Sequence, residues 1–400
     1  MRSNVHLSVL LMLLLTIGCS GEDSNAPTDP ADSSILRVPE DYPDLASAIA
    51  DSEIGFEISV APGTYEGTEN RNLVIEEEQY LTISGRSGEA SPILELDLRS
   101  RAFTVSPGAT LLLDRMKIQN GRADIGGAIR ITSGTAILKD VVVESCAASY
   151  GGALLVEQAT LVLERTSLRG NESTELDGGA VYAERSQVTI RETIISGNAA
   201  MGSGGGLSLD RSELELTRST VSGNRAHRQG GGLFAGRFST VHIDRTILWG
   251  NAASESGGAR SGHEFFALST AELSASCAAS DTTDGHAPQL DGISVVSDPR
   301  FVEEIVPAQA PTTSGDLRLQ ADSPCAEEHS PCEERIGSLD VVTIPGFTVD
   351  PSNQKLTALQ PSAAHLTRDT GESSPCNTAP ACPRRRSPAV TSPGQSRRVL

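Results

Sequence analysis

The chain has 400 residues, with 32 Lys and Arg against 52 Asp and Glu, so its formal net charge is -20. A surface of this sign repels a phosphate backbone, and no basic patch lies outside the arginine-rich C-terminal tail, which excludes nucleic acid as an expected partner. Aromatic residues make up 4% of the chain, whereas there are 38 glycines. This composition favours many short, tightly turned strands.

Residues 1–19 predict an export signal. Arg2 precedes an apolar run from Leu7 to Ile17, which is too short to span a bilayer. The run ends in Thr16-Ile17-Gly18-Cys19, which resembles the lipobox of bacterial lipoproteins, although Thr16 stands where leucine is usual. The resemblance implies that Cys19 is lipidated and that residues 20–34 form a flexible tether to the membrane. A plain secretory signal with an incidental cysteine is the alternative, and both place the protein outside the cytoplasm.

The segment from residue 35 to residue 65 predicts the start of the folded region. A strand over Ile35–Pro39 precedes a helix over Pro43–Ser52, and a second strand follows over Ile58–Tyr65. An open end of a stacked β-structure exposes edge strands and core, so we expect the helix to cap it. Strands around residues 73–83, 93–98 and 103–118 are expected to form early, less regular coils.

Two markers recur with a period of 25 to 27 residues between about residues 121 and 262. Because they keep the same phase, they predict a stack of coils with three short strands each. In such a stack, equivalent asparagines hydrogen-bond from coil to coil as a ladder. The first marker is Gly-Gly before Ala or Leu, beginning at Gly126, Gly151, Gly178, Gly205, Gly231 and Gly257. The second is an asparagine, at Asn171, Asn198, Asn224 and Asn251, with Cys146 in the same slot one coil earlier.

Between the markers, apolar residues alternate with polar ones, as in strands with one buried face. The inward pairs are Leu161/Leu163, Val188/Ile190, Leu214/Leu216 and Val241/Ile243. The two positions after each pair should also stack, and over the first four coils their charges alternate in sign, which stabilises adjacent strands. These columns are Asp114, Lys139, Glu164, Arg191, Thr217 and Asp244, and Arg115, Asp140, Arg165, Glu192, Arg218 and Arg245.

These patterns predict an all-β, right-handed parallel β-helix solenoid over residues 35–343, with an N-terminal capping helix and with its terminal coil and cap at 263–343. Val38–Pro43 and Val60–Tyr65 resemble the opening of bacterial pectin-lyase-like β-helix proteins. The repeats resemble those of chlamydial polymorphic outer membrane proteins. Asp298–Phe301, Gly315–Leu319 and Ser323–Cys325 resemble the last coil of similar surface proteins. The fold hosts lyases, hydrolases, esterases and adhesins, so the resemblance implies little about activity.

The remaining cysteines suggest disulfides, since export places them in an oxidising compartment. Cys325/Cys332 and Cys376/Cys382 each bracket a short polar loop, and neither pair has zinc-site spacing. Cys146 and Cys277 are expected to be small buried side chains. Residues 344–400 are rich in Pro, Ser, Thr and Arg, and we expect them to be disordered.

The sequence predicts no catalytic residue, metal site or cofactor, and leaves calcium binding at a loop acid as an open alternative. The outward acids alternate with bases, and His242, His263 and His286 have no acidic partner at a recognisable spacing. Tyr150 and Tyr182 lie near the Gly-Gly turns of neighbouring coils, so they are candidates for contacts to a glycan in a shallow groove, with turn packing as the alternative.

The leading interpretation is a non-catalytic surface lipoprotein of the outer membrane or cell surface. Its membrane contact would be the lipid anchor, and a long face would serve adhesion or the binding of a polysaccharide or another surface protein. The rival hypothesis is a carbohydrate-active enzyme, either a polysaccharide lyase or a glycan hydrolase. Its site would lie in the loops of the N-terminal coils, where three acids and an arginine would converge. The sequence does not predict the oligomeric state.

Overall fold

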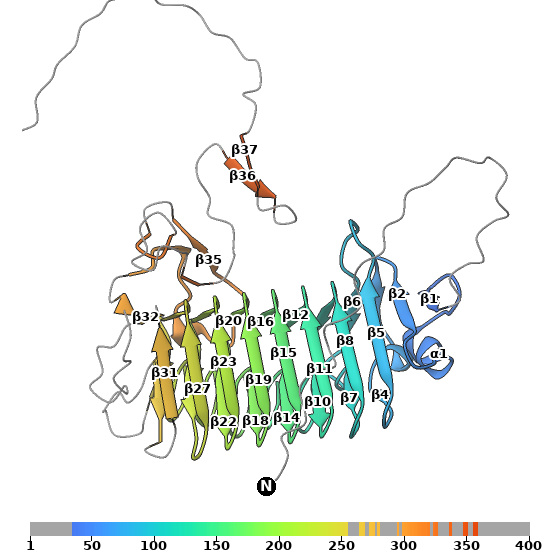
Figure 1. The fold of residues 1–400 in the computed structure, drawn as a ribbon, viewed down its shortest axis with the longest axis horizontal. Helices are drawn as coiled ribbons and strands as arrows, with labels where there is room; N and C mark the ends of the chain where they lie inside the picture. Colours follow the sequence, from blue (N-terminus) through green and yellow to red (C-terminus); the bar gives the residue numbers. More distant parts are fainter. Residues whose placement is uncertain are drawn as a thin grey trace, which may run out of the picture. The chain divides into compact units, whose positions relative to one another are not determined.

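Strands of successive coils lie side by side in parallel, as Figure 1 shows for the computed structural model of the chain. The structure describes residues 34–254, 264–268, 272–276, 278–280, 294–295, 298–320, 323–326, 336–337, 347–350 and 355–358. Within them the chain forms an all-β, right-handed parallel β-solenoid of about 8 turns. The fold class predicted from the repeats is therefore confirmed.

Four stacked sheets form the walls of the solenoid. Sheet A contains β1 (Ile35–Val38), β2 (Glu57–Val60), β5 (Tyr80–Gly85), β8 (Thr110–Asp114), β11 (Thr135–Lys139), β15 (Thr160–Glu164), β19 (Gln187–Arg191), β23 (Glu213–Thr217), β27 (Thr240–Asp244) and β31 (Glu272–Ser276). Sheet B contains β3 (Thr64–Tyr65), β6 (Ile93–Glu95), β9 (Lys117–Gln119), β12 (Val142–Glu144), β16 (Ser167–Arg169), β20 (Ile194–Ser196), β24 (Thr220–Ser222), β28 (Ile247–Trp249), β32 (Ala278–Ser280) and β33 (Ser294–Val295). Sheet C contains β4 (Leu73–Ile75), β7 (Phe103–Val105), β10 (Ile129–Thr132), β14 (Leu154–Glu157), β18 (Val181–Glu184), β22 (Leu207–Asp210), β26 (Leu233–Ala235) and β30 (Phe265–Ala267). Sheet D contains β13 (Ala147–Ala148), β17 (Glu172–Ser173), β21 (Ala199–Ala200), β25 (Arg225–Ala226) and β29 (Ala252–Ala253).

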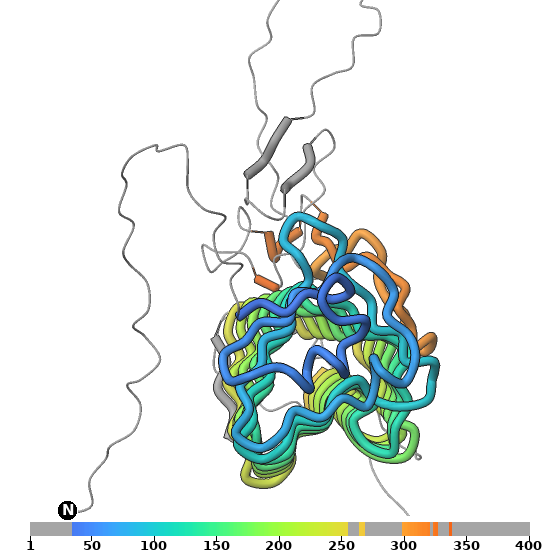
Figure 2. Tube along the Cα trace, turned by 90° about the vertical axis from the view of Figure 1, so that its right-hand side faces the viewer, coloured from blue at the N-terminus to red at the C-terminus, as the bar shows by residue number. Residues whose placement is uncertain are grey.

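Each regular coil crosses sheets C, A, B and D in that order, as in β14, β15, β16 and β17. Figure 2 looks along the stack from its N-terminal end and shows the coils superimposed. Three strands per coil were expected. The fourth, in sheet D, has two residues and directly follows the asparagine of each marker, where the ladder holds neighbouring backbones within hydrogen-bonding reach.

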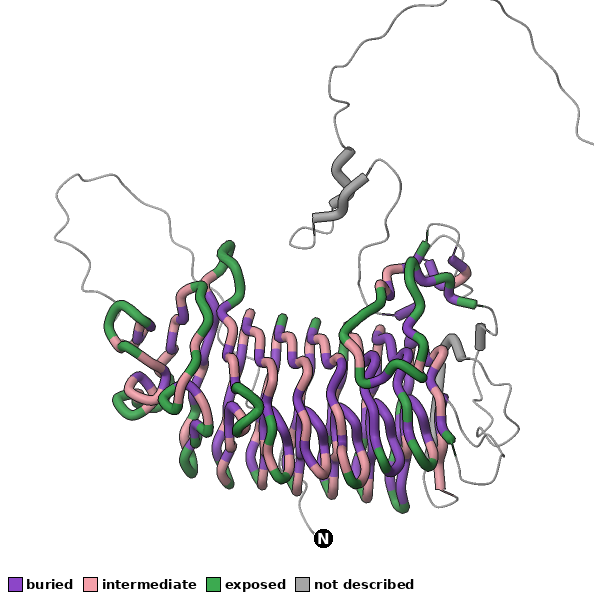
Figure 3. Tube along the Cα trace, turned by 180° about the vertical axis from the view of Figure 1, so that it is seen from behind, coloured by how far each residue is buried: buried purple, intermediate pink, exposed green. Residues whose placement is uncertain are grey.

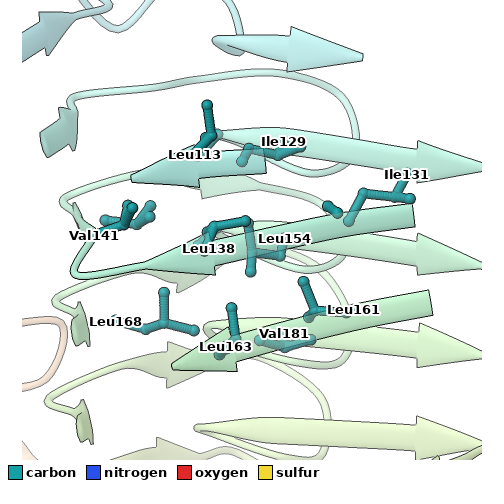
Figure 4. Close-up of a cluster of buried hydrophobic side chains, with 14 of the residues drawn as sticks. Leu113, Ile129, Ile131, Leu138, Val141, Leu154, Leu161, Leu163, Leu168 and Val181 are labelled. Atoms are coloured by element: carbon teal, nitrogen blue, oxygen red, sulfur yellow. The ribbon is translucent and has the colours of Figure 1, made fainter. Parts of the chain in front are cut away.

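Alternation along the strands buries one face of each sheet. In β15, Leu161 and Leu163 are fully buried, while Thr160, Val162 and Glu164 are partly exposed. Figure 3 shows the same alternation of buried and intermediate positions along the stacked coils. The inward side chains of successive coils pack into one continuous core, part of which appears in Figure 4. The expected inward pairs are therefore confirmed.

Strand register confirms the predicted charge columns. Lys139 pairs with Asp114 on one side and with Glu164 on the other, and Glu164 pairs with Arg191. The second column lies in the turns between sheets A and B, where its members have left-handed backbone conformations. There the Arg165 guanidinium binds both carboxylate oxygens of Asp140, at 2.9 and 2.8 Å.

The glycine marker needs one correction. Because Val181 pairs with Leu207, Gly178 is equivalent to Gly204 and not to Gly205. Leu207 pairs in turn with Leu233, so the equivalent in the next coil is Gly230 and not Gly231. Gly206 therefore takes the slot that holds alanine in earlier coils, and the run of glycines hid this shift by one residue. Gly257 lies outside the described residues.

Three polar ladders run inside the turns, at three of the four corners of the coil. The asparagine ladder lies between sheets B and D, where the amide nitrogen of Asn198 donates to Oδ1 of Asn224 at 2.9 Å. The other two ladders consist of hydroxyls that each accept from the backbone N–H of the previous coil. They comprise Ser186, Ser212 and Ser239 between sheets C and A, and Thr193, Ser219 and Thr246 between sheets A and B.

The helix expected near the N-terminus is present but shorter than predicted. It is α1 (Leu45–Ala50), and the Asp44 side chain accepts a hydrogen bond from the backbone N–H of Ser47 at its start. Leu45 and Ala48 are buried in the main core cluster. The capping role of this helix stays a prediction. A 3-10 turn, η1 (Thr68–Asn70), follows, and Oδ1 of Asn70 accepts from the backbone N–H of Leu45.

A later segment packs against the outside of the coils. Its antiparallel strands β34 (Phe301–Glu303) and β35 (Asp316–Leu319) flank a 3-10 turn, η2 (Pro307–Gln309). Phe301, Ile305 and Leu317 form a small second core with Ile247. The Thr312 backbone N–H donates to the Gly197 carbonyl at 2.8 Å, which ties the segment to the turns between sheets B and D.

The cysteine predictions have mixed outcomes. Cys325 has a free, buried thiol, so the suspected disulfide with Cys332 is not supported. Cys332, Cys376, Cys382 and Cys277 lie outside the described residues. Cys146 is buried, and that burial raises the pKa of its thiol to about 12.

In the tail expected to be disordered, the structure has an antiparallel hairpin of β36 (Phe347–Asp350) and β37 (Lys355–Ala358).

Candidate functional site

The asparagine ladder is internal and offers nothing to a ligand. Asn171, Asn198, Asn224 and Asn251 are at most 4% exposed, and each side chain bridges neighbouring coils. At one end the Cys146 backbone N–H donates to Oδ1 of Asn171, at 3.0 Å. At the other end the amide of Asn251 donates to the buried carboxylate of Glu264, at 2.5 Å. These residues hold the coils in register.

Tyr150 and Tyr182 meet on the outer side of sheet C. Their ring centroids are 5.3 Å apart and the ring planes make an angle of 53°. Tyr182 points outward from β18, between the inward residues Val181 and Ala183. Tyr150 stands in the turn just before Gly151, whose φ of 55° bends the chain back toward sheet C. The two residues proposed from the sequence are thus neighbours in space.

A second aromatic pair continues the same row. Outward residues of sheet C pair in the order Tyr182, Ser208, Phe234 and Phe266. The rings of Phe234 and Phe266 are stacked, with centroids 5.8 Å apart and an interplanar angle of 4°. Two strand spacings of about 4.8 Å separate Tyr182 from Phe234 along the axis of the stack. The aromatic row therefore runs parallel to that axis, with the buried Ser208 between its two aromatic pairs.

Acidic side chains surround Tyr182. Glu184 ends the same strand, and Asp210 ends the next strand of sheet C. The Arg211 guanidinium bridges these two carboxylates, with N–O distances of 2.9 and 2.6 Å. Burial and the nearby charges of Glu184, Asp210 and Asp177 raise the pKa of the Tyr182 hydroxyl above its ordinary value. Tyr182 is therefore a protonated hydrogen-bond donor at neutral pH. We call Tyr150, Asp177, Tyr182, Glu184 and Asp210 the sheet C site.

Asp177, like Glu184 and Asp210, is a member of this site that the sequence did not reveal. It stands just before Gly178, in the slot that Tyr150 occupies one coil earlier. Its Oδ1 accepts from the backbone N–H of Ser203 at 2.6 Å, and a side chain at Gly202 would collide with that oxygen. Burial raises the pKa of Asp177, and the Ser203 hydrogen bond and the charge of Arg228 offset this only in part.

The variant Asp177→Asn tests this electrostatic environment. A carboxyl group whose folded-state pKa is raised binds its proton more tightly in the folded state, so folding stability falls as pH rises from about 3.9, the unfolded value, through the raised value. We therefore expect Asp177→Asn to gain stability relative to the wild type across that interval and to keep the gain above it. Urea unfolding at a series of pH values measures the difference. A stability difference between Asp177→Asn and the wild type that is the same at every pH would contradict the raised pKa of Asp177.

The N-terminal coils have two neighbouring depressions where the rival hypothesis places an enzyme site. A depression of about 450 Å³ near α1 contains Arg71, Glu76 and Gln79, and a neighbouring one of about 560 Å³ contains Glu53, Glu77 and Glu78. Arg71 is held by Asp97 at 3.0 Å. Neither depression gathers three acids and an arginine in the described part of the chain. Among the same residues, no group of three or more His, Cys, Asp or Glu is placed to hold a metal ion.

Other candidates from the sequence lie elsewhere. His242 is on the outer face of sheet A, where it pairs in register with Glu215. Trp249 packs against the second core beside Ile247. Cys19, most of the tether, His263 and His286 lie outside the described residues. Across the ranges that the structure covers, no helix is long and apolar enough to cross a membrane.

Comparisons with known proteins identify no family. No family model and no curated protein matches the sequence. Among solved structures, the chain is similar to a pectin methylesterase from Aspergillus niger in deglycosylated form. The identity is 16%, 67% of this chain and 88% of that chain are covered, and the TM-score is 0.30. It is also similar to a PL6 family alginate lyase, with 9% identity, 79% and 60% coverage and a TM-score of 0.22. At these scores neither likeness bears on activity.

Proposed function

We propose that this chain is an exported, lipid-anchored β-helix protein of the outer membrane or cell surface that binds a glycan at the sheet C site without cleaving it. The observation that carries the proposal is the aromatic row, since rings held side by side on a rigid face offer apolar platforms for the faces of sugar rings. The carboxylates and hydroxyl around Tyr182 accept and donate hydrogen bonds to sugar hydroxyls.

The charge of the protein selects among glycans. Arginines pair with Glu184 and Asp210 in the site, so the selection rests on the whole chain, which has a net charge of -20. A polyuronate would be repelled by this surface. The favoured ligand is therefore a neutral polysaccharide, lying along the row of Tyr182 and Phe234.

Two further features belong to the same proposal. The sequence Thr16–Cys19 supports lipid attachment at Cys19. The burial of Leu45 and Ala48 in the core cluster supports a role for α1 as the cap of the first coil. A cap would keep an elongated protein monodisperse at this end, since it covers edges that otherwise pair with other chains.

The variant Tyr182→Ala tests the binding site. We expect it to weaken retention on an immobilised neutral polysaccharide by about tenfold or more, because it removes the ring that contacts Tyr150. Tyr182→Phe separates the ring from the hydroxyl and should retain most of the binding. Tyr80→Ala is the matched control, since Tyr80 is 42% exposed on sheet A. Affinity electrophoresis over neutral and acidic polysaccharides measures all four proteins, and equal retention of Tyr182→Ala and wild type would refute the site.

One observation favours a second candidate function. Asp177 is a partly buried carboxyl group whose pKa is raised by desolvation and by the charge of Asp210. A carboxyl group with a raised pKa close to a second carboxyl group is the pairing that glycoside hydrolysis uses. Release of new reducing ends from any polysaccharide, abolished by Asp177→Asn, would replace the binding proposal with this one.

A further inference from the structure

The outer face of sheet A has an apolar centre and polar ends. Leu112, Ile137 and Val162 point outward from the adjacent strands β8, β11 and β15, in register and partly exposed. On one side the row continues with Thr82 and Glu57, and on the other with Thr189, Glu215 and His242. An apolar centre inside a polar rim is the usual anatomy of a protein–protein interface.

The strand order allows two copies of this face to pack against each other about a twofold axis. Sheet A has ten strands, and β11 and β15 are its fifth and sixth, so the middle of the sheet lies between them. A twofold axis parallel to the strands at this point would place β11 of one copy on β15 of a second copy, and β8 on β19. Figure 1 shows these strands side by side in one broad sheet. Ile137 would then face Val162, and Leu112 would face Thr189.

The charges along the face fit the same axis. The outward row Asp114, Lys139, Glu164 and Arg191 alternates in sign, so its reversal places every charge opposite its complement. Lys139 faces Glu164 of the second copy, and Asp114 faces Arg191. The turn row Arg115, Asp140, Arg165 and Glu192 has the inverse alternation and is self-complementary for the same reason. Farther from the axis, Glu57 of one copy lies opposite His242 of the second copy.

The available area suits a stable dimer. Ten strands at about 4.8 Å and five residues at about 3.3 Å give a face of roughly 800 Å² in each copy. Specific interfaces of standard size bury about this much per partner.

We propose that the protein forms a symmetric dimer through the outer face of sheet A, with the two solenoids antiparallel. Sheet C is a separate wall of the solenoid, so dimerisation would leave the sheet C site of each copy accessible. Two sites in one particle would bind a long polymer more tightly than a single site. The proposal does not depend on glycan binding, because its test measures only the mass of the protein.

Charge reversal at the centre of the face distinguishes this dimer from others. We expect wild-type protein to sediment with twice the mass of its chain across the micromolar range. Lys139→Glu places like charges at two symmetric contacts and should weaken the dimer by about tenfold or more. Lys139→Glu with Glu164→Lys restores the opposition between the copies and should restore the dimer. Lys117→Glu on sheet B is the matched control. Like Lys139, Lys117 forms an ion pair with a glutamate of an adjacent strand, and its Nζ lies 2.6 Å from Oε1 of Glu144.

Sedimentation velocity measures the mass of each variant, and circular dichroism checks that each remains folded. A monomer at every concentration, or a dimer that Lys139→Glu leaves as tight as the Lys117→Glu control, would overturn the proposal. Failure of the double variant to recover the dimer would overturn the antiparallel arrangement.

Discussion

Replacing Gly179 with alanine is expected to lower the free energy of unfolding by about 3 kcal/mol, because the new methyl group has no space. A Cβ atom at this position would lie 2.0 Å from the Gly205 carbonyl oxygen of the next coil and 2.6 Å from the Ala199 oxygen. Both atoms belong to backbone, so no side-chain rotation relieves the collision. The Gly179 N–H also donates to the Gly204 carbonyl at 2.9 Å, and moving the coils apart would break that bond.

Gly250→Ala is the matched control for this prediction. Its φ of 65° strains any residue with a side chain, but its Cβ would lie 3.9 Å from the nearest atom, Oγ of Ser222. The expected loss is therefore about 1 kcal/mol, the cost of the left-handed backbone alone. Urea unfolding followed by circular dichroism compares the two variants. Equal losses of unfolding free energy would show that the close approach of the coils contributes little to the effect of Gly179→Ala.

Asn198→Ala is expected to cost about 4 kcal/mol, because it leaves buried polar groups without partners. Oδ1 of Asn198 accepts from the backbone N–H and the side-chain amide of Asn171, at 2.9 and 3.0 Å. Its amide nitrogen donates to the Leu168 carbonyl at 3.0 Å and to Oδ1 of Asn224 at 2.9 Å. Asn198 is fully buried, so water does not replace these bonds.

Thermal and urea unfolding of Asn198→Ala give the size of this loss. Ser167→Ala, a partly exposed outward position on β16, should change stability by no more than about 0.5 kcal/mol. Hydrogen exchange adds a local readout, since the Asn171 amide should lose protection first. A variant as stable as Ser167→Ala would show that the ladder is not needed to hold the coils in register.

Repeats made most of the architecture predictable from the sequence. A position that recurs every coil, such as that of Asn198 or of the inward pair Leu161 and Leu163, faces the same environment each time. One sequence therefore contains several independent observations of that environment. The glycine marker was placed one residue late, at Gly205 instead of Gly204, because a run of glycines does not define its own register.

The candidate site was only partly predictable. Tyr150 and Tyr182 could be proposed because both lie near the glycine turns of neighbouring coils. Asp177 could not, since an isolated acid before a glycine resembles an ordinary turn residue. Its burial depends on the turn of the next coil, where the Ser203 N–H meets its carboxylate.

The sequence by itself therefore determined the parallel solenoid, the inward faces of its strands and the columns of stacked charges. These properties follow from local alternation and from a repeat that every coil obeys. Apart from these columns, the tertiary structure alone decided which outward side chains of different coils meet on one surface. It placed Asp177 beside Tyr182 and the apolar row of Leu112, Ile137 and Val162 at the middle of sheet A. The physical reason is that an outward position without an alternating charge has no packing constraint that the sequence pattern records, so only the stacking of the coils reveals its neighbours.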